Sequence, residues 1–175
     1  MVKVQIVNVV ATASVNQPMD FEKLRMYSEI FHDSDVYGGR VAYFRTKTMH
    51  GKVSIFLSGK MISVGTKSEE QAQKELHMAK QFLFDNSFIK DVELHPCIQN
   101  LVVTVDFEHA LNLEELSQKT RAIYEPEQFP GAILRISQPF KTSVLIFASG
   151  KIVITGLKSQ SEIKPTIESL EKIIN

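Results

Sequence analysis

The sequence predicts an α+β fold in which one strand-and-helix unit occurs twice in tandem. The first observation is self-similarity, because residues 54–68 and 145–159 are identical at eight of fifteen positions. The second is a pair of β-branched runs at 4–13 and 97–105, which predict the opening strand of each copy. The third is an apolar stripe with helical spacing near the end of each copy.

The two copies are related by an offset of 91 or 92 residues. Asn8 aligns with Asn100 at offset 92, whereas the strongest block of identities aligns at 91. A one-residue insertion in a hairpin loop near residues 46–51 would account for this change. We therefore expect a first repeat at 1–92 and a second repeat at 93–175.

Each copy is expected to run strand, short helix, two or three strands, long helix. Asp20 is placed to cap a short helix that includes Ile30, and Asn112 caps the equivalent helix of the second copy. Ser68, followed by Gln71, caps the long helix of the first copy. The intervening strands are expected at 40–45, 53–57 and 60–64, and at 132–136, 143–148 and 151–155.

Composition indicates an ordinary folded protein of the cell interior. The chain has 175 residues, of which 43% are hydrophobic and 23% charged, and this balance suits a buried core. No run approaches the ~20 apolar residues of a membrane span. Its one cysteine, Cys97, excludes an internal disulfide and suggests a reducing compartment. We expect an intracellular protein.

The charge balance argues against a nucleic-acid binder that relies on cations alone. The net charge is zero, with 20 basic and 20 acidic residues. Residues 1–92 hold 12 basic and 10 acidic side chains, and residues 93–175 hold 8 and 10. This balance counts against a nucleic-acid binder unless the charges are segregated on its surface.

Catalytic interpretations of the sequence are weak. The five histidines lack metal-ligand spacing, and no carboxylate cluster supports an enzyme. Cys97 follows Pro96 and has no activating base beside it in the sequence, and Gly38-Gly39 lacks the continuation of a phosphate-binding loop. We expect a binding protein with no cofactor and no metal.

Several strands are apolar on both faces, among them residues 144–147 and 152–154. One alternative is that they are buried on both sides, as in a sandwich. The other is that four helices cover one face and leave an apolar face open for a ligand. The recurrence of Asn8 and Asn100 amid apolar residues, with paired lysines near the strand ends, favours the second alternative.

The segments YEPEQFPG (124–131) and LIFASGKIVITG (145–156) are specific in combination with IQN at 98–100 and TGxKS at 155–159. In this order they resemble the TATA-box-binding protein family, archaeal type, over essentially all 175 residues. The resemblance implies a two-repeat saddle, a curved antiparallel sheet of about ten strands with four helices on the convex face. It also implies a transcription initiation factor of a cell without a nucleus. Such a factor binds and bends the minor groove of A·T-rich promoter DNA and recruits transcription factor B and, indirectly, RNA polymerase.

The resemblance assigns roles to individual residues. Aromatic wedges would be Phe129 and Phe147 in the second repeat, and Phe56 with Tyr37 in the first. The remaining implied DNA contacts are polar, aliphatic or cationic: Asn8, Asn100 and Thr155; Val10, Val64, Val102, Leu145 and Val153; Lys60, Lys67, Arg135, Lys151 and Lys158. Glu125 and Glu127 resemble the surface that binds transcription factor B.

The first repeat departs from the family pattern. Tyr37 replaces a phenylalanine, Ser54 replaces an aliphatic residue, and Val64 replaces the threonine equivalent to Thr155. Tyr43 aligns with Arg135, and Arg45 takes that place if the insertion falls earlier in the chain. We expect lower affinity or an altered sequence preference at the end of the site that Tyr37 contacts, because a tyrosine wedge must desolvate its hydroxyl or keep it in water. A diverged paralogue remains the alternative: a protein-interaction module that binds transcription factor B and binds DNA weakly. A homodimer of the free protein is also left open.

Overall fold

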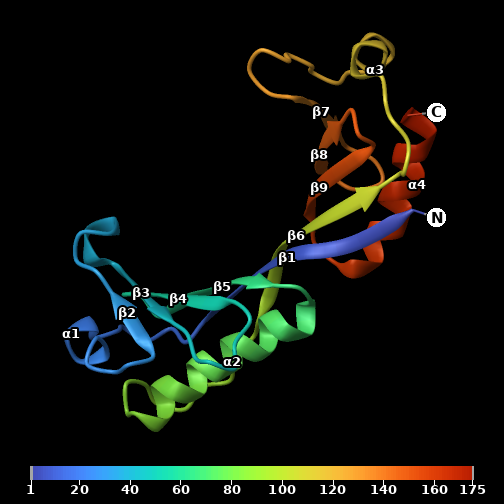
Figure 1. The fold of residues 1–175 in the computed structure, drawn as a ribbon. Helices are drawn as coiled ribbons and strands as arrows, with labels where there is room; N and C mark the ends of the chain where they lie inside the picture. Colours follow the sequence, from blue (N-terminus) through green and yellow to red (C-terminus); the bar gives the residue numbers. More distant parts are fainter. Residues whose placement is uncertain (1, 175) are drawn as a thin grey trace. The chain divides into compact units, whose positions relative to one another are not determined.

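The computed structural model describes residues 2–174 and divides the chain into two compact units (Figure 1). The repeat-one unit is Asn8–Gln99. The repeat-two unit contains the residues up to Val7 together with those from Asn100 onward. The opening strand of the chain thus contributes residues to both units, so the compact units do not coincide with the sequence repeats at 1–92 and 93–175.

Each unit contains strands, a short helix and a long helix in the expected order. The repeat-one elements are β1 (Lys3–Ser14), α1 (Phe21–Leu24), β2 (Ile30–His32), a 3-10 turn (Tyr37–Gly39), β3 (Val41–Phe44), β4 (Lys52–Phe56), β5 (Lys60–Thr66) and α2 (Glu69–Asp85). The repeat-two elements are β6 (Cys97–Asp106), α3 (Leu113–Lys119), β7 (Gly131–Ile136), β8 (Thr142–Phe147), β9 (Lys151–Leu157), a 3-10 turn (Gln160–Glu162) and α4 (Ile163–Ile174).

The strands pair antiparallel in the same way in both units, which confirms the α+β class. The repeat-one strands lie in the order β2-β3-β4-β5-β1, and the repeat-two strands in the order β6-β9-β8-β7. The described residues form nine strands. The second repeat has a single bridge between Ile123 and Ile133 where the first repeat has β2 paired with β3.

The expected caps are confirmed. The side chains of Asp20, Ser68 and Asn112 each accept a hydrogen bond from the backbone N–H three residues later. The extent of the first helix was wrong, because α1 ends at Leu24 and Ile30 lies in β2. Four residues form little more than one helical turn, and Ile30 gains more by burial in an edge strand.

The core lies on one face of the strands in each unit. On β8, Thr142, Val144 and Ile146 are buried, whereas the alternate residues are only half-buried. Helix α2 packs against β4 and β5 on the buried side of the repeat-one unit (Figure 1). We call the other face of the strands in each unit its open face. Its partial exposure contradicts the alternative in which these strands are buried on both sides. No helix among residues 2–174 is long and apolar enough to cross a membrane.

A buried carboxylate holds the loop before β4 against α2. Glu75 is 3% exposed, and its Oε1 accepts hydrogen bonds from the backbone N–H groups of His50 (2.8 Å) and Gly51 (3.0 Å). We expect Glu75→Ala to lower the free energy of unfolding by about 2 kcal/mol or more, since a buried donor loses its acceptor. Urea unfolding followed by circular dichroism measures this, with Lys74→Ala on exposed α2 surface as control. Equal midpoints for the two variants would contradict it.

Candidate nucleic-acid interface

The strand register defines equivalent rows of side chains on the two open faces. In the repeat-two unit, one row crosses the strands in register: Ile123, Ile133, Leu145, Val153 and Thr104. In the repeat-one unit, the matching row is Phe31, Tyr43, Ser54, Ile62 and Thr12. The register therefore confirms that Ser54 and Leu145 occupy equivalent positions in the two repeats. It also pairs Val64 with Thr155, because these residues lie opposite Lys52 and Ser143, respectively.

The two asparagines are held in the same way by backbone groups. Asn8 Oδ1 accepts a hydrogen bond from Gly65 N at 2.8 Å, and Asn100 Oδ1 accepts one from Gly156 N at 2.7 Å. A backbone N–H can only donate, so each amide must present its oxygen to the glycine. The Nδ2 groups are then directed away from that glycine, and Asn100 Nδ2 lies 3.3 Å from Thr155 Oγ1.

Gly65 and Gly156 supply the backbone conformation that these asparagines need. Their φ angles are +93° and +103°, a region that side-chain-bearing residues rarely adopt. The register of the opening strands shifts nearby, between Val9 and Ala11 and between Leu101 and Val102. A local bulge of this kind changes the direction in which neighbouring groups point. The hydrogen bond from a glycine N–H to an asparagine side chain, with the glycine at positive φ, thus occurs at equivalent positions in both repeats.

In the second repeat, two aromatic rings contact each other and pack against a glycine. The rings of Phe129 and Phe147 lie with centroids 5.8 Å apart at 62°, a favourable edge-to-face geometry. A Cβ on Gly131 would come within 2.9 Å of the Phe129 ring and 3.1 Å of the Phe147 ring. Both rings are half-buried, so each keeps an accessible surface.

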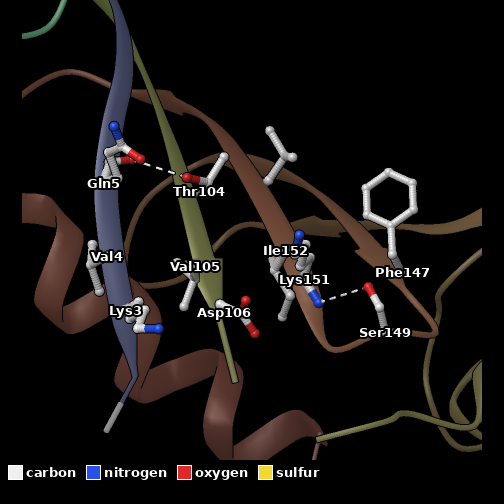
Figure 2. Close-up of a pocket in the computed structure, with 11 residues that line it drawn as sticks. Lys3, Val4, Gln5, Thr104, Val105, Asp106, Phe147, Ser149, Lys151 and Ile152 are labelled. Carbon is white, nitrogen blue, oxygen red and sulfur yellow. Dashed lines mark hydrogen bonds between the residues drawn. The ribbon is translucent and has the colours of Figure 1, made fainter. Parts of the chain in front are cut away.

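A hollow of ≈ 810 Å³ lies beside Phe147 within the repeat-two unit. Figure 2 shows Phe147 at one side and the start of β1 at the other, with β6 and β9 between them. Lys151 and Asp106 also line the hollow, and Gln5 accepts a hydrogen bond from Thr104 across its floor through its backbone oxygen (3.5 Å). The open face beside the aromatic pair is thus concave, and its lining includes apolar, polar and charged side chains.

The first repeat does not reproduce this aromatic pair. Phe56 lies opposite Val41, and Phe147 lies opposite Gly131, so Val41 occupies the position of Gly131. Counting back two residues from Val41 reaches Gly39, so the alignment of Tyr37 with Phe129 is not reproduced. Tyr37 is 74% exposed and has a left-handed φ of +49°.

The register also settles the counterpart of Arg135. Leu134 and Phe44 are equivalent, because they lie opposite Val144 and Val53, so the next residue, Arg45, matches Arg135. Tyr43 instead matches Ile133. The first repeat therefore has two more residues than the second between its asparagine and β3. Its hairpin loop between β3 and β4 is one residue shorter than the loop between β7 and β8. A single insertion near residues 46–51 was the wrong explanation.

The sequence interpretation missed an aromatic and cationic group on the open face of the repeat-one unit. We call Phe31, Tyr43 and Lys52 the Phe31 cluster. The rings of Phe31 and Tyr43 are stacked at 6.3 Å and 28°, and Lys52 Nζ lies 4.2 Å from the centre of the Tyr43 ring. Treating residue 30 as helical hid the strand that places Phe31 there; the alternation Ile30 in, Phe31 out was the available signal.

The expected cations and acidic residues are all exposed. They are Lys60, Lys67, Arg135, Lys151 and Lys158, with Glu125 and Glu127. Lys60 and Lys151 each begin the strand that follows a tight turn, so they occupy equivalent places. Glu125 and Glu127 lie in the loop before β7, where the backbone oxygen of Glu125 accepts hydrogen bonds from the N–H groups of Gln128 and Phe129. Between residues 2 and 174, no three His, Cys, Asp or Glu side chains are grouped to hold a metal ion.

Comparison with known proteins relates the whole chain to one family. A family model described as "Transcription factor TFIID (or TATA-binding protein, TBP)" matches residues 3–84 and 95–175. The TATA-box-binding protein of Cenarchaeum symbiosum is 38% identical over 161 residues, which cover 91% of this chain and 87% of that protein. The TATA-box-binding protein of Methanocaldococcus jannaschii is 36% identical, covering 99% and 92%. The solved structure of Methanococcus jannaschii TBP is similar, with a TM-score of 0.86 and 32% sequence identity over 98% of both chains.

Proposed function

The chain belongs to the TATA-box-binding protein family, and on this basis we propose that it is a general transcription initiation factor. It binds and bends the minor groove of A·T-rich promoter DNA and recruits transcription factor B, and through it RNA polymerase. The observation that carries the proposal is the pair of open faces, each with an asparagine amide set among aliphatic side chains. Tyr37 as a DNA contact stays a prediction from the sequence.

The chemistry of these faces suits A·T pairs. In the minor groove an A·T pair presents only acceptors, whereas a G·C pair adds the exocyclic amine of guanine. Val102, Leu145 and Val153 give the repeat-two face an aliphatic surface, and Val10 and Val64 do the same in repeat one. Such a surface fits against flat base edges and is obstructed by the amine. The outward Nδ2 groups of Asn8 and Asn100 donate to adenine N3 or thymine O2.

Bending follows from the aromatic wedges. Opening a base step costs a few kcal/mol, and an inserted apolar ring recovers part of this cost by stacking and burial. Phe129 and Phe147 support each other in a fixed geometry, so little side-chain freedom is lost when they enter a step. Phe56 supplies the equivalent contact in the repeat-one unit.

The cations contribute a limited number of phosphate contacts, which accords with a net charge of zero. Log affinity should fall with log salt concentration at about −0.9 per neutralised phosphate. We expect Lys151→Ala and Lys60→Ala each to flatten this slope by about one unit. Fluorescence anisotropy titrations of a labelled duplex at several salt concentrations measure it, with Lys74→Ala as control. An unchanged slope in a variant removes that lysine from the site.

The recruiting surface is the loop before β7. Glu125 and Glu127 are exposed there and give the second repeat an acidic patch suited to a basic partner. A gel-shift titration with a TATA-containing duplex, with and without transcription factor B, tests the whole proposal. We expect a shift by the protein alone and a further shift with the factor. Absence of any protein–DNA complex under both conditions would refute it.

One observation favours a second candidate function. The repeat-one face carries Ser54 and Val41 where the repeat-two face carries Leu145 and Gly131, so the two faces are not equally suited to DNA. A paralogue that binds transcription factor B and binds DNA weakly would show this drift. In the gel-shift experiment such a paralogue would give at most a weak complex with DNA alone, whereas a pull-down without DNA would show that it binds transcription factor B.

A further inference from the structure

The Phe31 cluster is ordered within the protein but remains open on one side. Tyr43 contacts Phe31 through ring stacking and Lys52 through its ring face. Phe31 itself is 61% exposed, although it lies on an edge strand next to a buried core. An exposed aromatic ring supported by a second ring is a platform for another flat or apolar group.

The cluster occurs in one repeat only. The equivalent residues of the second repeat, read from the strand register, are Ile123, Ile133 and Ser143. Ile123 is also exposed, at 60%, so the position itself faces solvent in both units. At these three positions the first repeat has two aromatic rings and a cation, and the second repeat has two aliphatic side chains and a hydroxyl.

The chemistry of the cluster favours nucleic acid as its occupant. A stacked aromatic ring accepts a base or a deoxyribose, and the neighbouring ammonium group accepts a phosphate. Phe31 and Tyr43 also lie in the same register row as Ser54, Ile62 and Thr12, and Lys52 precedes Ser54 by two residues on β4. The cluster therefore continues the repeat-one open face to the edge strand β2. A purely apolar protein contact would not need Lys52 at this place.

We propose that Phe31, Tyr43 and Lys52 form a DNA contact specific to the first repeat. Phe31 rests its free face on a base or deoxyribose of the bound DNA, Tyr43 supports the ring from behind, and Lys52 contacts a phosphate of the same strand. This inference rests on the proposed function. Because the second repeat lacks the contact, the two halves of a bound duplex are held unequally, and the protein prefers one of the two directions on a near-symmetric A·T-rich site.

Affinity measurements test the contact. We expect Phe31→Ala to weaken binding of a TATA-containing duplex by about tenfold, and Lys52→Ser to flatten the salt slope by about 0.9. Phe84→Ala is the matched control, because Phe84 is an exposed phenylalanine on α2 with Lys80 Nζ 5.4 Å from its ring centre. Circular dichroism establishes that each variant is folded, and Lys52→Ser, which changes an exposed side chain, decides the question if Phe31→Ala does not fold.

The direction in which the protein binds the duplex is measured by fluorescence energy transfer. A donor dye is attached at Met26→Cys, an exposed position of the repeat-one unit, in a Cys97→Ser background, and the acceptor is placed on one or the other end of the duplex. We expect unequal transfer to the two ends. The triple variant Phe31→Ile, Tyr43→Ile, Lys52→Ser, which carries aliphatic and hydroxyl side chains as in repeat two, should reduce the inequality.

The outcomes separate the two proposals. If the protein without these substitutions binds no duplex, the proposed function fails and this contact fails with it. If it binds, and Phe31→Ala and Lys52→Ser match the Phe84→Ala control in affinity and salt slope, the proposed function stands and the contact alone is refuted. A loss of affinity for transcription factor B rather than DNA would also overturn it.

Discussion

Replacing Phe147 by alanine is expected to weaken binding to a TATA-containing duplex by about 30- to 150-fold. The substitution removes one ring of the Phe129–Phe147 pair and leaves the other without its edge-to-face neighbour. It therefore removes both stacking in the opened base step and the support that fixes the remaining wedge. Anisotropy titration against one duplex at constant salt measures the loss.

The comparison with Phe56→Ala makes this prediction sharper. Phe56 lies opposite Val41, which has a side chain at the position where the second repeat has Gly131, the glycine that leaves room for the Phe129 and Phe147 rings. We expect Phe56→Ala to lose less affinity than Phe147→Ala, because no preassembled pair is broken. Equal losses would show that preassembly contributes nothing. A loss below about threefold for Phe147→Ala would remove this ring from the base step.

The repeat and the helix caps could be predicted because each depends on local signals. Identical residues at a fixed offset reveal a duplicated unit, and Asp20, Ser68 and Asn112 act on groups three residues away. The repeated asparagines were also visible in the sequence. Their anchoring by Gly65 and Gly156 was not, since the two residues of each pair are 57 and 56 positions apart and meet only through strand pairing.

The unequal first repeat shows what sequence alignment cannot supply. Tyr37 aligned with Phe129 because Gly39 and Gly131 looked equivalent, yet cross-strand register makes Val41 the counterpart of Gly131. Register is fixed by which face each side chain must bury. Two opposite changes of loop length, of two residues and of one, leave only a one-residue change in the overall offset, so the offset does not reveal them. The Phe31 cluster was missed for a different reason: the alternation of Ile30 and Phe31 lies in an edge strand of three residues, which is too short to outweigh the helical interpretation of residue 30.

Asn100→Asp is expected to reduce DNA affinity by about 100-fold or more while leaving the fold intact. The aspartate keeps an oxygen for the Gly156 N–H, so the hydrogen bond that holds the side chain is retained. In the proposed complex, the outward amide would become a negatively charged oxygen that faces the acceptors of the minor groove and lies near the phosphates. The substitution thus replaces a hydrogen-bond donor by an acceptor, which the groove acceptors and the phosphates repel, and the side-chain shape stays nearly the same. Urea unfolding should show a free energy close to that of the unsubstituted protein, and anisotropy titration should show the loss.

Asn8→Asp provides the matched test in the other repeat. Asn8 is held by Gly65 in the same way, so its substitution should also spare stability and cost affinity. Its neighbour Val64 lacks the hydroxyl that Thr155 places 3.3 Å from Asn100, so the Asn8 amide has one fewer internal partner and depends more on the DNA acceptor. We therefore expect a loss at least as large as that of Asn100→Asp. Retained affinity in both variants would mean that neither amide donates to the groove, and the physical basis for A·T preference at the centre of the site would be lost.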